Sequence, residues 1–503
     1  MSPIIPRWEW RTFGDRLAPA EAAFAALEST GVQESDELYL VAQDGQNVKV
    51  RDALMDIKLL RETDARGLER WEPVMKAAFP ISPDQVAEVA RALAIPAPTG
   101  RSSWSLADFL ADVAGPESAI RAVQVQKRRV RYRVGGCTSE VTEVVADGRH
   151  SRTIAIESED AAAVVEAVAA MGLVGFRNIS YPKGLRGLLD GTPARYAVID
   201  TGTNSVKFHL AEVVPDGRWH TLADRAEVTR LGEGLAESGV IADAALDRTA
   251  TAIGAMAQEA WGAGALGVVA VGTAGLRIAR NGAAVVTAIA ERTGVAIEII
   301  SGDEESRLAY LAVAAALPLA AGTTVVFDTG GGSSQFTFGD GTAVTERFSV
   351  DVGAARYTER FGLDRAVSEE TIGAARAAIA ADLSRVGGRP RPDVLVGMGG
   401  GITNITAVSL GMTRYDAARI QGASLERAEV DRQIEAYRAL DADGRRSIPG
   451  LQPKRAEVIL AGACIVRTVM ELLDHDRLTV SDRGLRHGVL AERFAARTEG
   501  TEP

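Results

Sequence analysis

The stretch Val325-Val-Phe-Asp-Thr-Gly-Gly-Gly-Ser-Ser-Gln-Phe-Thr-Phe338 decides the fold of this chain. An apolar strand runs into Asp328 and three successive glycines, and Ser333, Ser334 and Gln335 lead into a second alternating strand. Glycine permits positive φ and close approach of the backbone, so consecutive N–H groups can point at an anion. The pattern predicts a phosphate-holding hairpin with a carboxylate at the end of its first strand.

The same pattern occurs earlier, as Tyr196-Ala-Val-Ile-Asp-Thr-Gly-Thr-Asn-Ser-Val-Lys-Phe-His-Leu210. The two copies align without a gap, which places Asp200 with Asp328, Gly202 with Gly330, Ser205 with Ser333 and Lys207 with Gln335. One such turn would be weak evidence of anything. A pair in register predicts a duplicated domain with two phosphate-binding turns.

Composition bounds the class of protein. The 503 residues are 46% hydrophobic and 24% charged, which is typical of a soluble globular protein of two to four domains. The sequence has no apolar run long enough to span a membrane and no signal-peptide core, so we expect a cytoplasmic protein. A net charge of −11 disfavours nucleic-acid binding, because an anionic ligand then needs locally concentrated cations.

Cysteine and histidine give little support for a metal or disulfide site. Cys137 and Cys464 lie far apart without a partner motif, so we expect reduced thiols. The five histidines are scattered and none has metal-ligand spacing, which argues against a zinc site.

Residues 1 to about 180 are expected to form strands with one charged face. Side chains alternate along a strand. This rule gathers Arg7, Glu9, Arg11, Lys49, Arg51, Lys58, Lys127, Arg129, Arg131 and Arg133 on such faces. A single charged face is typical of the solvated side of a sheet. Four cations on one strand, and helical segments at 82–93 and 160–171 to cover the outside, favour a charged interior.

This region resembles a CYTH domain, the triphosphate-tunnel fold. The resemblance implies an α+β antiparallel domain over residues 1–180, whose tunnel binds polyphosphate-type anions and Mg²⁺. The opening Glu-x-Glu-x-Lys pattern of that family is Arg7-x-Glu9-x-Arg11 in this chain. Because the first carboxylate is missing, we expect the tunnel to bind an anionic chain rather than to catalyse with a metal.

The rest of the chain is predicted to be a linker and two α/β lobes. Residues 181–194 carry proline and glycine at both ends without clear periodicity, which predicts a linker. From residue 195, strands and helices alternate around the two hairpins. This predicts related lobes at 195–322 and 323–503 with a cleft between them, the second with a mainly helical C-terminal part.

Six motifs in this part resemble the exopolyphosphatase/guanosine pentaphosphatase family, which has a duplicated actin/hexokinase-like fold. They are Asp200-Thr-Gly-Thr-Asn-Ser205, Arg230-Leu-Gly-Glu-Gly234, Thr273-Ala-Gly-Leu-Arg277, Ser301-Gly-Asp-Glu-Glu305, Asp328-Thr-Gly-Gly-Gly-Ser333 and Gly397-Met-Gly-Gly-Gly401. The resemblance extends from about Arg195 to His487. It implies hydrolysis of phosphoanhydride bonds.

That chemistry needs donors on the phosphoryl oxygens, a positioned water and a divalent cation. The residues expected to hold phosphate are Gly202, Thr203, Asn204, Ser205, Gly330, Gly331, Gly332, Ser333 and Ser334. Arg277 follows a strand and is expected to add a bidentate contact, although a surface ion pair is its alternative. Asp200 and Asp328, at strand ends, suit Mg²⁺.

The general base should be a carboxylate near the attacking water. Glu304 and Glu305 stand where a helix is expected to begin, and the helix dipole there favours the ionised form that a base must have. Acidic helix starts are also common without catalysis. The resemblance aligns Glu305 with the family's catalytic glutamate, so we expect Glu305 rather than Glu304 to act.

One position departs from the family pattern. Its hairpin usually continues Gly-Gly-Gly-Ser-Thr-Glu, and Gln335 stands where that last glutamate is expected. An amide can orient water or donate to phosphate, but it cannot act as an anionic ligand or base. Weaker activity, lower metal affinity or a different substrate would follow.

The leading hypothesis is a Mg²⁺-dependent exopolyphosphatase whose N-terminal domain holds the polyphosphate chain. Hydrolysis of guanosine pentaphosphate is the alternative enzyme activity. A polyphosphate-binding sensor that has lost catalysis is a third hypothesis, consistent with Gln335 and with Arg7-x-Glu9-x-Arg11. A kinase activity on the same fold is disfavoured, because only Gly399–Gly401 hints at a nucleotide site. The family resemblance suggests a homodimer.

Overall fold

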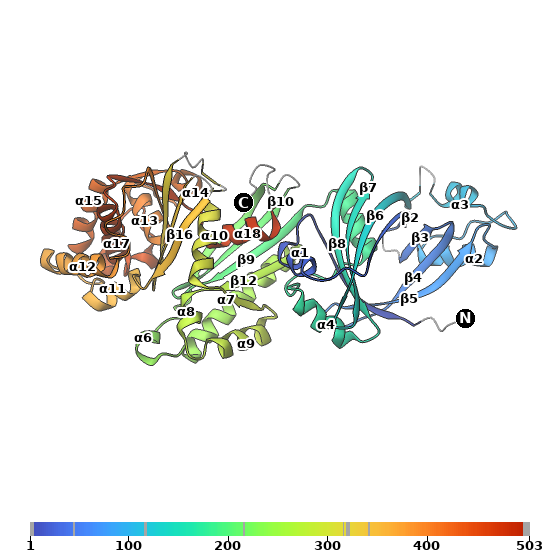
Figure 1. The fold of residues 1–503 in the computed structure, drawn as a ribbon, viewed down its shortest axis with the longest axis horizontal. Helices are drawn as coiled ribbons and strands as arrows, with labels where there is room; N and C mark the ends of the chain where they lie inside the picture. Colours follow the sequence, from blue (N-terminus) through green and yellow to red (C-terminus); the bar gives the residue numbers. More distant parts are fainter. Residues whose placement is uncertain are drawn as a thin grey trace.

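The computed structural model describes residues 5–43, 46–114, 118–214, 217–314, 316–317, 322–340 and 343–495. An N-terminal barrel lies at one end of the molecule, a first α/β lobe in the middle and a second α/β lobe at the other end (Figure 1). The outer ends of the expected ranges 1–180 and 323–503 lie outside the described residues.

Eight antiparallel strands close the barrel in the order β1-β5-β4-β3-β2-β6-β7-β8. They are β1 (Arg7–Gly14), β2 (Gly31–Val41), β3 (Asn47–Arg51), β4 (Leu54–Thr63), β5 (Glu69–Ala78), β6 (Arg121–Val134), β7 (Cys137–Ala146) and β8 (Arg149–Ser158). Along β6, Lys127 and Arg129 are buried and Arg128 between them is exposed, as the alternation predicts. The expected tunnel-like architecture is therefore present, and its assignment to the CYTH family stays a prediction.

Four helices cover the barrel: α1 (Ala18–Ala25), α2 (Pro83–Ala92), α3 (Leu106–Val113) and α4 (Ala161–Ala170). The two helices predicted at 82–93 and 160–171 are α2 and α4, which are capped by the side chains of Ser82 and Asp160. Val86 and Val89 of α2 pack with Met55 on the outside of the barrel. The polar face of the strands is thereby left to the interior.

The expected linker at 181–194 is instead mostly helix α5 (Tyr181–Asp190). Its buried residues Tyr181, Leu185 and Leu189 recur every four positions and pack in one cluster with barrel residues that include Val123 and Val125. Pro182 lies in the first turn, where no N–H is needed, and Gly191 ends the helix in the left-handed region at φ 65°. The proline and glycine that suggested a linker are therefore the start and stop signals of a packed helix.

The first lobe is built on a five-stranded sheet in the order β11-β10-β9-β12-β13. Its strands are β9 (Ala194–Thr201), β10 (Ser205–Val213), β11 (Trp219–Val228), β12 (Gly267–Gly272) and β13 (Ile297–Ile299). Its helices are α6 (Leu235–Ser238), α7 (Asp243–Gly262), α8 (Ala274–Ile278), α9 (Gly282–Thr293) and α10 (Gly302–Ala314). The strands β9 and β10 form the first hairpin.

The second lobe repeats this topology in the sheet β16-β15-β14-β17-β19-β18. Its strands are β14 (Thr323–Thr329), β15 (Ser334–Asp340), β16 (Ala343–Val350), β17 (Val394–Met398), β18 (Ser424–Glu426) and β19 (Arg477–Ser481). Its helices are α11 (Ala354–Phe361), α12 (Glu369–Asp382), α13 (Gly400–Ser409), α14 (Ala417–Ile420), α15 (Arg427–Arg438), α16 (Ala442–Arg445), the 3₁₀ helix η1 (Pro453–Arg455), α17 (Ile459–Leu472) and α18 (Leu485–Phe494). In each lobe an antiparallel hairpin is followed by two parallel strands, which shows the duplication.

Two helices cross between the lobes. Helix α10 follows the first sheet in sequence but packs on the second, where Tyr310 joins a cluster with Val326 and Met398. Helix α18, near the C-terminus, packs on the first sheet, where the Phe494 ring stacks on Tyr196 at 4.2 Å between centroids. These helices also contact each other, so the lobes are held together at the base of the cleft.

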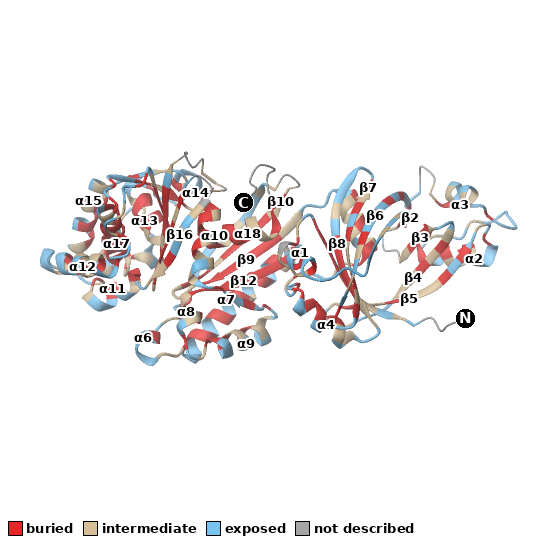
Figure 2. Cartoon of the chain, viewed as in Figure 1, coloured by how far each residue is buried: buried red, intermediate tan, exposed pale blue. Residues whose placement is uncertain are grey.

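Burial concentrates in the two sheets, in α17 and in the wall between barrel and first lobe (Figure 2). One apolar cluster runs from Trp10 in the barrel to Val198 in the first sheet, so the barrel is packed onto that lobe. Cys137 and Cys464 are both buried and free. Within the described residues, the helices are all too short or too polar to cross a membrane.

Candidate active site

Two equivalent turns form the centre of the site. In the β9–β10 turn, the Gly202 amide donates to the Ser205 carbonyl at 3.1 Å, and in the β14–β15 turn the Gly330 amide donates to the Ser333 carbonyl at 2.9 Å. The in-register copies predicted from the sequence thus have the same hydrogen-bonded geometry.

The turns lie against each other across the cleft between the lobes. A Cβ placed on Gly331 would lie 3.2 Å from the Asn204 Cβ, and one placed on Gly332 would lie 3.6 Å from the Thr203 hydroxyl. The amides of these four residues donate to no acceptor in the described parts of the chain. Free amides on opposed turns are the arrangement that binds anions.

The serines of the second turn differ in what they can offer. Ser333 is buried and its hydroxyl accepts from the Gln335 amide at 2.7 Å. Ser334 donates to the Val352 carbonyl at 2.6 Å and is fully buried. Of the two hydroxyls predicted to hold phosphate, only that of Ser333 is left with a proton to donate, while that of Ser334 fastens the turn to the loop behind it.

Asp200 and Asp328 stand at equivalent strand ends, opposite Lys207 and Gln335 in their hairpins. The Lys207 ammonium lies 3.1 Å from Asp200. Burial raises the pKa of Asp328, and Asp200 raises it further against the opposing effect of Lys207. Asp200 and Asp328 offer buried carboxylate oxygens, the ligand type that Mg²⁺ takes, so they fit the ion that the sequence predicts, with Lys207, Arg455 and Arg486 as the cations around them.

Glu305, in the first turn of α10, is joined to the same group. The Arg277 guanidinium donates to its carboxylate at 2.9 Å and to the Ile300 carbonyl at 2.9 Å. Burial raises the pKa of Glu305 to about 7, with Arg277 opposing and Asp200 and Asp328 adding to the rise. The helix dipole was expected to keep this group ionised, and the desolvated, negatively charged surroundings outweigh it.

The structure separates the two candidate bases. Glu304 pairs with Arg307 at 2.7 Å, and Arg307 also pairs with Glu492 of α18. The Arg307 guanidinium lowers the pKa of Glu304. Glu304 therefore belongs to the ion pairs that join α10 to α18, whereas Glu305 faces the two aspartates.

Gln335 is buried beside Glu305's helix rather than turned to solvent. Its amide nitrogen donates to the hydroxyls of Ser333 and Ser349, at 2.7 and 3.3 Å. Ser349 in turn lies against Gly302 at the start of α10, near Arg277. The position thus orients a turn serine, a task that a neutral donor can perform.

Arg455 is a site residue that the sequence reasoning missed. It ends η1 and lines the cleft beside the second turn, with Gly330, Gly331 and Asn204. Burial lowers the pKa of Arg455, and its guanidinium has no hydrogen-bond or ion-pair partner among the described side chains. A desolvated, unpaired guanidinium at a nest of free amides is poised to bind a phosphoryl oxygen.

Two glycines of the motif at 397–401 allow these groups to approach. Gly399 has φ 97°, and a Cβ there would lie 2.2 Å from the Asp328 carboxylate. A Cβ at Gly400 would lie 2.4 Å from the Arg455 guanidinium. Glycine is needed at both positions, because any larger side chain would clash with Asp328 or Arg455.

Arg486 is a second missed residue. It follows the start of α18, and its guanidinium binds both oxygens of Asp224 on β11, at 2.7 and 3.0 Å. It also contributes to the electrostatic environment of Asp328 and Lys207. Its position depends on the packing of α18 on the first sheet, which no local pattern reveals.

A second charged cavity, of about 160 Å³, lies inside the barrel. Of the predicted tunnel residues, Glu9, Arg11, Lys49, Arg51, Lys58, Lys127, Arg129 and Arg131 line it. Arg7 is exposed and pairs with Glu157, and Arg133 is exposed and donates to the Gly136 carbonyl, so these two are not part of the lining. The alternation rule holds, but both lie toward strand ends, outside the cavity.

The buried centre of this cavity was also missed. The fully buried Glu37 accepts from Lys49 at 3.0 Å, from Lys127 at 3.1 Å and from Arg129 at 2.5 Å. Burial lowers the pKa of Lys127, whose ammonium lies 3.7 Å from the centre of the Tyr181 ring. Glu37, which strand alternation on β2 places inward, thus neutralises part of the cationic lining, and Glu9 and Glu140 pair with Arg11 on another wall.

Two duplicated lobes with opposed glycine-rich turns, three neighbouring carboxylates and the unpaired Arg455 guanidinium are typical of a phosphate-handling enzyme of the actin-like class. Comparison with known proteins narrows this class. The model of the Ppx/GppA phosphatase family matches residues 211–496. The chain belongs to the Ppx/GppA phosphatase family, and it is a phosphoanhydride hydrolase.

Individual relatives agree with this. The chain is 29% identical over 318 residues to exopolyphosphatase 2 of Mycobacterium tuberculosis, covering 59% of this chain and 97% of that protein. It is 27% identical over 315 residues to exopolyphosphatase 1 of Mycobacterium leprae, covering 61% and 91%. The crystal structure of the Aquifex aeolicus Ppx/GppA family member superimposes with a TM-score of 0.53 at 31% identity, covering 59% of this chain and 96% of that one.

Proposed function

We propose that the chain is an exopolyphosphatase that releases orthophosphate from the end of inorganic polyphosphate. The observation that carries the proposal is the joining, in one polypeptide, of a cleft with free turn amides and a barrel whose cavity is lined by more cationic than acidic side chains. Relatives that share the cleft are named exopolyphosphatases. Two anion sites on one chain suit a long anionic substrate.

In the proposed reaction the terminal phosphoryl group lies between the turns, on the amides of Gly331 and Asn204, with Arg455 on its oxygens. Glu305 accepts a proton from water as the water oxygen bonds to the terminal phosphorus. The bond from that phosphorus to its bridging oxygen breaks, so that orthophosphate leaves the shortened chain. Asp200 and Asp328 would hold Mg²⁺, which supplies positive charge against the phosphoryl oxygens when bound.

Glu305 is suited to this role by its environment. A general base works best when its pKa lies near the working pH, and burial raises the pKa of Glu305 to about 7. Arg277 fixes the carboxylate through the contact at 2.9 Å and at the same time favours its ionised form. The carboxylate is therefore held in place yet able to accept a proton.

The test is phosphate release from polyphosphate of defined length in Mg²⁺. Glu305→Gln keeps the shape of the side chain and removes the base, so we expect a loss of about 10²–10⁴-fold in kcat. Glu304→Gln is the matched control on the adjacent residue, and its rate should stay within about threefold, since surface ion pairs contribute little. Equal rates for wild type and Glu305→Gln would refute the proposed base.

The barrel's part in the proposal is tested separately. Lys58 and Arg131 line the cavity without belonging to the ion pairs of Glu37. A Lys58→Met/Arg131→Met variant should raise KM for long polyphosphate several-fold and leave kcat on tripolyphosphate unchanged. Arg128→Met, on the exposed face of the same strand, is the control. An unchanged KM for long chains would remove the barrel from substrate binding.

Hydrolysis of guanosine pentaphosphate is the second candidate. The cleft beside Arg455 has an apolar wall made of Ala354, Ala355, Val458 and Ile459, against which a nucleoside could lie. Side-by-side kcat/KM values on guanosine pentaphosphate and polyphosphate decide between the substrates. Tight polyphosphate binding without turnover, with any divalent ion, would instead support a sensor.

A further inference from the structure

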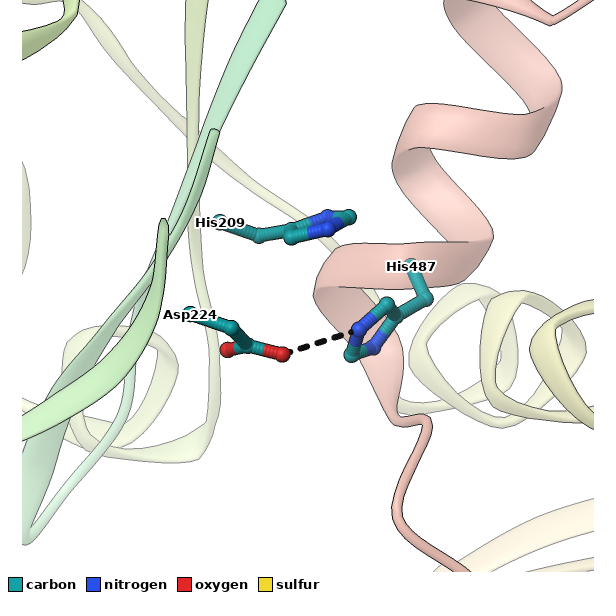
Figure 3. A group of neighbouring side chains, drawn as sticks. All are labelled: His209, Asp224 and His487. Carbon is teal, nitrogen blue, oxygen red and sulfur yellow. Dashed lines mark ion pairs between the residues drawn. The ribbon is translucent and has the colours of Figure 1, made fainter. Parts of the chain in front are cut away.

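Two histidines and an aspartate from distant parts of the sequence meet beside the first lobe. His209 lies on β10, Asp224 on the neighbouring strand β11 and His487 in the first turn of α18. One ring nitrogen of each histidine and one carboxylate oxygen all lie within 4.8 Å of one another. Figure 3 shows the three side chains converging from the two strands and the helix. The imidazole rings are 4.4 Å apart between centroids.

His209 is the residue of this cluster with an unsatisfied ring nitrogen. Its side chain is 0% exposed, and its Nε2 contacts the Thr221 hydroxyl at 3.0 Å. Its Nδ1 is buried without a hydrogen-bond partner among the described residues. With Nε2 occupied by Thr221, Nδ1 is the ring nitrogen left for a ligand. An unpartnered polar atom in a buried place costs free energy unless a ligand meets it.

The other two residues are held in fixed positions. His487 contacts the Asp224 carboxylate through Nε2 at 3.1 Å. Arg486 binds the same carboxylate at 2.7 and 3.0 Å and so fixes its orientation, in the way that outer hydrogen bonds orient metal ligands. A carboxylate has lone-pair sites for two such partners and a further ligand.

We propose that His209, Asp224 and His487 form a binding site for a zinc-class transition metal ion, which fastens helix α18 to the β10–β11 edge of the first lobe. Two imidazoles and one carboxylate, with a fourth position for water, are a ligand set that Zn²⁺ accepts. The site joins residues that are more than 250 positions apart in sequence at the helix that closes the base of the cleft.

The charged groups around the three residues favour a transition metal over Mg²⁺. Arg483 and Arg486 offset Asp224 and Asp482 nearby, so the local charge offers little to a hard cation. The binding energy must come from the imidazoles, which suit zinc, copper or nickel and not Mg²⁺.

Binding requires one rearrangement. The His487 Nδ1 accepts from the Gly484 amide at 3.1 Å, so without metal its proton sits on Nε2. Coordination through Nε2 moves that proton to Nδ1 and displaces the Gly484 amide. The losses are the neutral hydrogen bond from Gly484 and the Nε2–H contact with Asp224, and the bonds of both groups to the metal replace them.

Sequence spacing predicted no zinc site, and the reason is now clear. Spacing finds ligands that share a helix or a loop. Here the ligands come from two strands and a helix that meet only when α18 packs on the first sheet. The expectation drawn from scattered histidines therefore does not apply to a site assembled by the tertiary fold.

The test is metal binding by the tag-free full-length chain, stripped with chelator and titrated with Zn²⁺ in millimolar Mg²⁺, which competes with Zn²⁺ for the carboxylates of the cleft. We expect one Zn²⁺ per chain, a rise in Tm on its addition, and, with Co²⁺, visible absorption typical of a four-coordinate site. His209→Leu should weaken Zn²⁺ binding by at least about 100-fold and abolish the rise in Tm.

His220→Ala is the matched control, since His220 is exposed on β11 and lies outside the cluster. It should bind Zn²⁺ like the wild type. If His209→Leu fails to fold by circular dichroism, His487→Gln serves in its place, because the amide can still contact Asp224. Absence of bound Zn²⁺ in the wild type, or undiminished binding in both cluster variants, would overturn the proposal.

Discussion

The two hairpins have the same backbone and different electrostatics. In the first, Lys207 lies 3.1 Å from Asp200 and neutralises it. In the second, the equivalent Gln335 turns to Ser333 and leaves Asp328, whose pKa burial raises, without a cation of its own hairpin. One duplicated scaffold thus provides a neutral anchoring turn and a charged turn next to Glu305. The duplication therefore fixes the backbone geometry of the two turns, and single side chains give each turn a different charge.

A first test of this difference removes Arg455, the cation that lies beside the second turn but belongs to the 3₁₀ helix η1. Arg455→Leu takes away a desolvated guanidinium beside free amides. We expect kcat/KM for polyphosphate to fall by about 10²–10³-fold. Lys454→Leu, at the exposed neighbouring position, is the control. A loss below threefold in Arg455→Leu would show that this arginine does not contact the substrate.

A second test gives the first hairpin the uncharged side chain that the second hairpin has at the equivalent position. Lys207→Gln leaves Asp200 and Asp328 without the ammonium between them. Since breaking a buried ion pair strands a charge, we expect the free energy of unfolding to fall by about 3 kcal/mol in the absence of divalent ions. Added Mg²⁺ should restore part of this by binding the folded state.

Urea denaturation of wild type and variant, with and without Mg²⁺, measures the effect. The Arg128→Met chain, changed only at an exposed position of the barrel, serves as the reference for a neutral surface substitution. A Lys207→Gln variant as stable as the wild type without Mg²⁺ would mean that Lys207 does not balance the aspartates.

A third test measures how kcat depends on pH. Glu305 must be ionised to accept a proton, and burial raises its pKa to about 7. We therefore expect kcat to fall by about tenfold per pH unit as pH drops below 7. A bound cation favours the carboxylate form, so higher Mg²⁺ should move the midpoint to lower pH. Rates from pH 5 to 9 at two Mg²⁺ concentrations test this, and a midpoint that stays near 4.5 would contradict it.

Most of the second half of the fold was predictable, because its signals are local. The hairpins at Asp200 and Asp328 are in register, and their glycines permit only a few turn geometries. Glu305 was placed correctly in the first turn of a helix, whereas its ion pair with Arg277 was not predicted. These elements needed no knowledge of how the lobes pack, and the comparison with known proteins confirmed the family.

The residues and contacts that the sequence did not predict depend on packing between distant segments. Arg455, Arg486 and the exchange of α10 with α18 arise only when the lobes close on each other. The sequence predicts a linker at helix α5, because the proline and glycine that start and stop this helix are also typical of loops. In the barrel, Glu37 gains its three cationic partners only when β2, β3 and β6 lie side by side. The dimer, the cytoplasmic location and Mg²⁺ stay predictions.

The smallest effect comes from making the second turn more acidic. Gln335→Glu places a carboxylate close to Asp328 and Glu305, where Mg²⁺ would be held. We expect tighter Mg²⁺ dependence and a gain in turnover of about two- to tenfold at limiting Mg²⁺. The gain should vanish at saturating Mg²⁺, because the added charge acts through metal affinity. Gln335→Met is the control, since it removes the contact to Ser333 without adding charge. If Gln335→Glu and Gln335→Met lose activity alike, the amide is needed to orient Ser333, and the second hairpin depends on that hydrogen bond more than on its charge.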